Sequence, residues 1–113
     1  MTDISIRNAN GTWTVRAGGA VLGESRDALE LSEAGLPDMI YFPRGDIAMA
    51  FLDQTDHTTH CPKKGDATYF SIVTKSTTLE NAAWSYENPI EGAERIAGYI
   101  AFYATDFVTV ERV

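Results

Sequence analysis

The chain of 113 residues is poor in cysteine, and its only one, Cys61, cannot form an internal disulfide. No apolar run approaches the roughly 20 residues that a membrane-spanning helix needs. The first residues show neither the basic start nor the apolar stretch of a secretory signal peptide. These absences are typical of a protein in a reducing compartment. We therefore expect a cytoplasmic protein that is not inserted in a membrane.

Basic residues are also scarce: nine lysines and arginines stand against 16 acidic residues, which leaves a net charge of −7. A chain of this charge repels nucleic-acid phosphates and anionic lipid, so we expect neither as a partner. The acidic residues are concentrated in residues 27–38, which contain no basic residue, whereas residues 63–75 contain three lysines. A small anion is therefore still compatible with the local charge.

Three familiar motifs are missing as well: a CxxC pair, the HExxH zinc motif and the phosphate-binding GxxxxGK[ST] loop. What remains is a composition close to that of soluble globular proteins, with 44% apolar and 22% charged residues. A length of 113 residues suits one domain, and we expect residues 1–113 to form it.

Period-two alternation of apolar and polar residues is the main structural signal, and it predicts an all-β, mainly antiparallel fold. Gly18-Gly19 suits a tight hairpin turn, and we expect a final hairpin through Thr105-Asp106. Residues 47–52 suit either a strand or a helical turn, residues 89–97 one short helix, and residues 56–66 an irregular loop. The expected strands are 4–7, 12–16, 20–25, 28–31, 39–42, 69–73, 99–103 and 107–110, and residues 79–86 are expected to hold a return strand and the loop after it.

Both histidines and the cysteine lie between Asp56 and Asp66, which makes this segment the densest concentration of reactive side chains. In a helical turn, His57, His60 and Cys61 would cluster on one face. In an extended strand, His57 and Cys61 would share a face and His60 would point away. Metal sites need three or four ligands. We expect no metal here, and these three residues are the candidates if one binds.

The same segment suits nucleophilic catalysis, in which Cys61 is the thiolate, His57 or His60 the base, and Asp66 or Asp56 the orienting carboxylate. Cysteine is also one of the residue types most often buried as inert packing. A structural use of the loop is equally consistent with its residues, because Asp56 can accept hydrogen bonds from the following threonines in an Asx turn.

Binding of a small molecule is the leading hypothesis, because polar side chains of rare types occur close to aromatic strands. The runner-up is an enzyme, and the third hypothesis is an interaction module that forms homo-oligomers through exposed strand edges at Ile4–Arg7 or Phe107–Val110. The sequence leaves the cofactor unidentified. The candidate ligand-binding residues are His57, His60, Lys64, Asp66, Tyr69, Trp84 and Tyr86, with Tyr41 and Arg44 as weaker candidates.

Four sequence blocks carry a family resemblance: DHTTHCP at residues 56–62, KGDA at 64–67, AWSY at 83–86 and AGYIAFY at 97–103. Together they resemble the domain-of-unknown-function family 427, over about Trp13 to Val110. The resemblance implies a small bacterial or fungal β protein, with two small sheets meeting at a steep angle in a β-tent-like arrangement. It also links residues 56–66 with Trp84-Ser85-Tyr86 as one signature.

That family has also been labelled nucleotidyltransferase-like. The Gly-Ser and paired-Asp pattern that would hold a metal–triphosphate complex is missing from this sequence, and only Lys64, Asp66 and Arg44 suit such roles. Other β-tent proteins often bind zinc through two CxxC pairs, and that site does not transfer to this chain.

Overall fold

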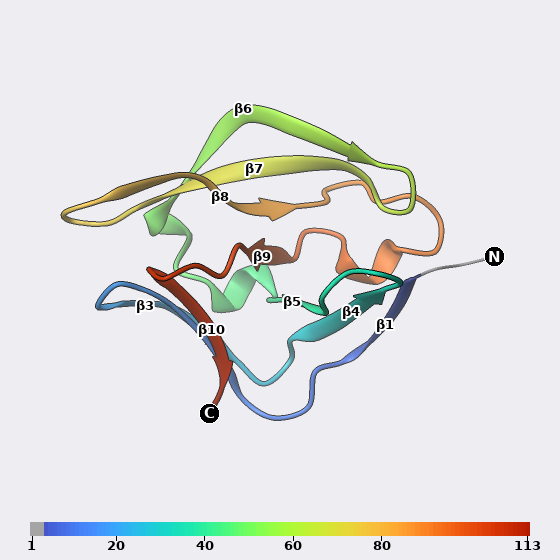
Figure 1. Cartoon of the computed structure of the whole chain (residues 1–113), viewed down its shortest axis with the longest axis horizontal. Coiled ribbons are helices and arrows are strands. Elements are labelled where there is room, and N and C mark those ends of the chain that lie inside the picture. Colours follow the sequence, from blue (N-terminus) through green and yellow to red (C-terminus); the bar gives the residue numbers. More distant parts are fainter. Residues whose placement is uncertain (1–3) are drawn as a thin grey trace.

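The computed structural model describes residues 4–113, and within this range it contains ten strands and three short 3₁₀ turns (Figure 1). The residues Met1–Asp3, on which the expectation about a signal peptide partly rests, lie outside the described range. The strands form three antiparallel sheets, which confirms the expected all-β, antiparallel class. In the described part of the chain, no helix has the length and apolar character to cross a membrane.

The largest sheet has four strands and carries the signature segments. Its strand order is β6 (Leu52–Cys61), β7 (Gly65–Val73), β8 (Thr78–Ser85) and β9 (Ile100–Phe102). A second sheet has the order β1 (Ile4–Asn8), β4 (Leu29–Glu33) and β5 (Met39–Tyr41). The third has the order β10 (Val108–Arg112), β2 (Trp13–Ala17) and β3 (Ala20–Ser25).

The first two sheets are joined just beyond β5. The Phe42 amide donates to the Ile100 carbonyl at 2.8 Å, and the Ile100 amide donates to the Phe42 carbonyl at 2.9 Å. Strand β9 therefore has a neighbour on each side, and β6, β7, β8, β9, β5, β4 and β1 follow one another across a single surface (Figure 1). The chain thus forms three small antiparallel sheets, where the resemblance implied two, and the bridge at Phe42 and Ile100 joins two of them into one composite surface.

Side-chain alternation gives the composite surface two apolar faces. Phe70, Ile72 and Phe102 pack in one cluster together with residues of the third sheet such as Val15 and Leu22. Their neighbours along the strands point the other way and form a second cluster, which is rich in tyrosine. That second cluster contains Leu29, Leu31, Tyr41, Ala67, Tyr69, Trp84, Tyr86, Ala93, Ile96 and Ala101. We call the face that carries this second cluster the inner face.

The predicted β2–β3 hairpin is confirmed, with Gly18 at the turn in the left-handed conformation (φ 60°) that glycine adopts readily. The predicted final hairpin is wrong, because β9 pairs with β8 and β10 pairs with β2. The physical reason is that both edges of β9 are already occupied, by β8 and by Phe42. The strands β1 and β10 do lie at sheet edges, and pairing between subunits there stays a prediction.

The short helix expected at residues 89–97 is only a 3₁₀ turn at Glu94–Ile96, and residues 47–52 contain another at Met49–Phe51 before β6 begins. A helix of so few residues gains too few hydrogen bonds to offset the ordering of its first turn. Gly92, with φ of 100°, also interrupts the helical path.

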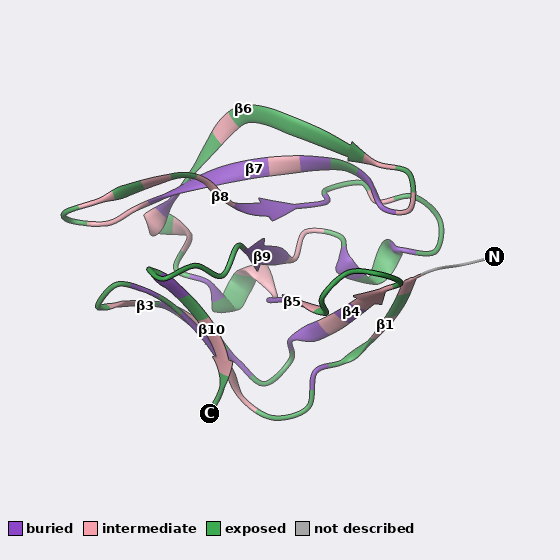
Figure 2. Ribbon diagram, in the orientation of Figure 1, coloured by how far each residue is buried: buried purple, intermediate pink, exposed green. Residues whose placement is uncertain are grey.

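The segment 56–66 is not the expected irregular loop. It is a β-hairpin in which β6 runs to Cys61, the chain turns, and β7 begins at Gly65, whose φ is 113°. The sequence did not predict this strand, because β6 is an edge strand with polar residues on both faces and therefore has no apolar alternation (Figure 2).

Candidate functional site

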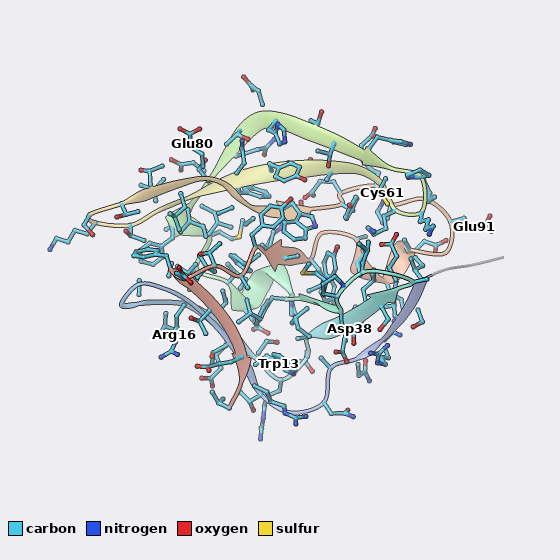
Figure 3. The ribbon with its side chains drawn as sticks, in the orientation of Figure 1. Trp13, Arg16, Asp38, Cys61, Glu80 and Glu91 are labelled. Carbon is cyan, nitrogen blue, oxygen red and sulfur yellow. The ribbon has the colours of Figure 1, made fainter. Side chains whose placement is uncertain are left out.

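Because the segment is extended, its reactive residues are divided between the two faces of the hairpin. The His57 ring lies 4.6 Å from the Tyr69 ring, centroid to centroid, and Cys61 packs against the inner-face cluster. His60 instead bonds to its cross-strand partner Asp66, with 2.7 Å between Nδ1 and Oδ1. This is the arrangement predicted for an extended strand. Figure 3 shows Cys61 at the turn end of the hairpin.

The divided arrangement keeps His57, His60 and Cys61 from forming a common cluster. Within residues 4–113, no group of three or more His, Cys, Asp or Glu side chains is placed to hold a metal ion. Cys61 and His60 alternate along β6, so the Cys61–His60–Asp66 arrangement is not formed either.

On the inner face, five rings from four strands and the segment after β9 form what we call the aromatic row: His57, Tyr69, Trp84, Tyr41 and Tyr103. Centroid distances are 6.4 Å for Tyr69–Trp84, 4.4 Å for Trp84–Tyr103 and 6.5 Å for Tyr41–Trp84. Contacts of this geometry between rings stabilise a fold beyond the area they bury. The row brings together four predicted ligand residues and Tyr103, which was not predicted.

Hydrogen bonds hold the rings in place. The Tyr69 hydroxyl lies 3.0 Å from Thr59 Oγ1 and 3.4 Å from the Tyr103 hydroxyl, and Trp84 Nε1 donates to the Tyr41 hydroxyl at 3.3 Å. The hydrogen bond to Tyr69, together with burial, raises the pKa of Tyr103 to about 12. Burial also raises the pKa of Tyr41. These phenols therefore stay protonated at neutral pH and act as neutral hydrogen-bonding groups.

A buried ion pair lies on the same inner face. Lys64, in the β6–β7 turn, donates to Glu33 at the end of β4, with 2.6 Å between Nζ and Oε1. Its ammonium lies 6.0 Å from the centre of the Tyr86 ring. Burial alone would lower the pKa of Lys64, but its contacts with Glu33 and Cys61 raise that pKa overall. Lys64, which the sequence predicted as a ligand contact, thus forms an ion pair with Glu33.

The opposite face carries the predicted residues His60 and Asp66. His60, Asp66, Thr68 and Glu87 line a hollow of about 270 Å³. Since Asp66 bonds to Nδ1 of His60, a proton held there leaves Nε2 as an acceptor, which is the form that a general base requires. Arg44 stands apart in its own network.

The guanidinium of Arg44 donates to the Gly98 carbonyl at 3.1 Å, to Ser85 Oγ at 3.3 Å and to Glu87. Ser85 also donates to Glu87 and is fully enclosed. These bonds connect the segment after β5 to β8 and to the turn before β9. Arg44 is therefore separated from the aromatic row and holds the strands together.

Two residues of the inner face were missed. Tyr103 follows Ala101 by two positions, so strand periodicity alone puts both on one face. The sequence did not show which side chains Tyr103 contacts in space. Glu33 appeared only as part of an acidic stretch, and its contact with Lys64 spans 31 residues of sequence.

Residues 5–113, which span all three sheets, match the family described as a domain of unknown function, DUF427. The chain belongs to the DUF427 family. The match confirms the resemblance carried by the four sequence blocks. No curated protein shows significant similarity to this DUF427 chain. In this family member, the signature formed by residues 56–66 and Trp84-Ser85-Tyr86 lies on the β6–β7 hairpin and on the neighbouring β8 with the residue after it. Its side chains lie on both faces of the sheet.

Proposed function

We propose that this DUF427 protein binds a small planar molecule at the exposed end of the aromatic row. The observation that carries the proposal is a difference in solvent exposure among the rings of the aromatic row. Tyr69 and Trp84 are each only 6% exposed and are fixed by hydrogen bonds, whereas Tyr103 is 45% exposed and His57 is also exposed. Both exposed rings touch a buried ring of the row.

This contrast matches what recognition of a flat ligand requires. The buried rings provide a rigid base, and the exposed rings offer faces and edges for stacking, each contact being worth about 0.5–1.5 kcal/mol. The hydroxyls of Thr59 and Tyr103 and the imidazole of His57 lie beside these rings and can fix the orientation of a heteroaromatic ligand.

Two indole groups make the proposal testable by NMR. Trp84 Nε1 belongs to the row, whereas Trp13 Nε1 donates to the Asn10 carbonyl at 3.2 Å elsewhere in the fold. We expect a set of planar heteroaromatic fragments to contain members that shift the Trp84 indole signal saturably and leave the Trp13 signal in place. Saturated fragments of the same size serve as controls.

Tyr103→Ala removes an exposed ring of the row, and Phe107→Ala removes a ring that is 37% exposed but lies outside it. We expect the first variant to weaken binding of any active fragment severalfold and the second to leave it unchanged. The proposal fails if no planar fragment shifts the Trp84 signal, or if both variants behave alike.

We also propose acid–base catalysis as a second candidate, because the bonded pair of His60 and Asp66 borders the 270 Å³ hollow. Hydrolysis of an activated aryl ester offers a simple test of this imidazole. We expect His60→Gln to abolish the activity and His57→Gln to preserve it. Equal rates in the two variants would contradict a role for the hollow.

A further inference from the structure

A hollow that none of the predicted residues line lies between the β1–β2 connection, the β3–β4 connection and the segment from the last 3₁₀ turn to β9. Its volume is about 410 Å³, within the usual range for small-molecule sites. Its buried floor includes Ala9 and Ala28, whose backbones are joined by a 2.9 Å hydrogen bond. Its polar wall contains Asn8, Asn10, Arg26, Asp27, Arg95 and Tyr99.

The two guanidiniums in this wall differ from those of three other arginines. Arg7, Arg16 and Arg44 each form ion pairs with carboxylates. Arg95 donates only to neutral oxygens in the described structure, the Ile6 carbonyl at 2.9 Å and Asn8 Oδ1 at 3.0 Å.

Arg26 has no hydrogen bond or ion pair to any of residues 4–113. Arg26 and Arg95 thus bring two positive charges to one hollow, and neither forms a salt bridge with any of residues 4–113, in a chain whose net charge is −7. A guanidinium is a fork of donors that matches a carboxylate or a phosphate.

We propose that this hollow binds a small organic anion that carries a phosphate or carboxylate group together with a hydroxyl. Arg26 and Arg95 bind the oxyanion, and the amide of Asn10 and the hydroxyl of Tyr99 supply neutral hydrogen-bonding groups. Asp27 is the one carboxylate in the wall. It accepts a hydrogen bond from the ligand hydroxyl and disfavours ligands of high negative charge.

The site is independent of the planar-ligand site, because His57, Tyr69, Trp84 and Tyr103 do not line it. Either proposal can therefore fail while the other stands.

The test is an NMR titration of backbone amides with inorganic phosphate, glycerol 3-phosphate, lactate and uncharged glycerol. We expect saturable shifts at Asn10 and Gly11 with the three anions and none with glycerol. If glycerol 3-phosphate gives the larger response, phosphate is the preferred group. If lactate gives the larger response, carboxylate is the preferred group.

Arg26→Gln is the decisive variant, because Arg26 makes no bond that the described fold needs. We expect it to weaken anion binding about tenfold, since one charge-assisted hydrogen-bonding group is lost. Arg16→Gln is the matched control, because Arg16 is paired with Glu111 at 2.5 Å outside the hollow. Thermal unfolding verifies that both variants are folded.

Asp27→Asn tests the hydroxyl contact separately. We expect it to strengthen binding of inorganic phosphate, by removing a negative charge, and to reduce the preference for glycerol 3-phosphate over phosphate. The proposal is overturned if none of the anions gives saturable shifts at the hollow, or if Arg26→Gln and Arg16→Gln weaken binding equally, which would show unspecific charge attraction.

Discussion

Lys64 in the β6–β7 turn and Glu33 at the end of β4 are in direct contact, with 2.6 Å between Nζ and Oε1. In the order of strands, β8, β9 and β5 separate β7 from β4. Neighbouring strands lie about 4.8 Å apart, so a flat surface would hold β7 and β4 roughly 20 Å apart. The contact shows that the composite surface folds back over its inner face, and the ion pair joins its two sides.

The first prediction concerns this ion pair. The Lys64 and Glu33 side chains are only 10% and 11% exposed, so Lys64→Met leaves a nearly buried carboxylate with a weaker partner, Lys63 at 3.7 Å. We expect a loss of about 3–5 kcal/mol in the free energy of unfolding, as for other buried pairs from which one partner is removed. Urea denaturation measures it.

Lys75→Met is the matched control, since Lys75 is exposed in the β7–β8 turn. We expect it to change stability by less than about 0.5 kcal/mol. The double variant Lys64→Met, Glu33→Leu removes both charges, and we expect it to be more stable than Lys64→Met alone. Equal stability of the two lysine variants would show that the pair does not hold the surface together.

The second prediction is a loss of stability at alkaline pH. The folded-state pKa values of Tyr41, Tyr86 and Lys64 are raised, and that of Tyr103 is raised to about 12. Each group binds its proton more tightly in the folded state than in the unfolded state. Their contribution is therefore complete below the unfolded values, about 10 for tyrosine, and is lost as pH rises through the folded values.

We expect the free energy of unfolding to fall steeply above about pH 10, and the tyrosinate absorbance of Tyr41, Tyr86 and Tyr103 to appear late and together with unfolding. Tyr103→Phe removes one of the titrating groups and should reduce the slope. An absorbance rise complete near pH 10 in folded protein would contradict the raised pKa values.

The third prediction concerns Gly23, where β3 lies against the chain before β6. A Cβ atom there would stand 2.6 Å from the Asp46 carbonyl oxygen and 2.6 Å from Ile47 Cδ1. Gly23→Ala must displace backbone, and we expect it to cost about 1–3 kcal/mol in the free energy of unfolding. Gly19→Ala is the control, because a Cβ at Gly19 meets nothing within 4 Å. Similar melting temperatures for the two variants would refute the close contact.

The fourth prediction uses the two histidines, which lie on opposite faces of the same strand. If a planar ligand binds at the aromatic row, His57→Ala removes a ring that contacts Tyr69 and should weaken binding by about 2- to 10-fold. His60→Ala leaves the row intact and should bind the ligand as the unchanged protein does. A stronger effect of His60→Ala would place the ligand on the other face.

Local sequence was sufficient for some elements and insufficient for others. The β2–β3 hairpin was predictable because its turn and its alternating strands are adjacent in sequence. The partners of β9 and β10 were not, because each pairs with a strand distant in the chain. For residues 56–66, the two possible arrangements of His57, His60 and Cys61 were predictable, but the choice between them depended on β7 as a pairing partner.

By itself, the sequence determined the all-β class, the family and the segment in which reactive side chains are concentrated. These properties follow from residue types and from local periodicity. Only the tertiary structure decided that His57 faces Tyr69, that His60 faces Asp66, and that Arg26 and Arg95 meet at one hollow. Each of these three relationships depends on how strands or connections pair and fold back, and this pairing is set by burial of the whole core rather than by any local stretch of residues.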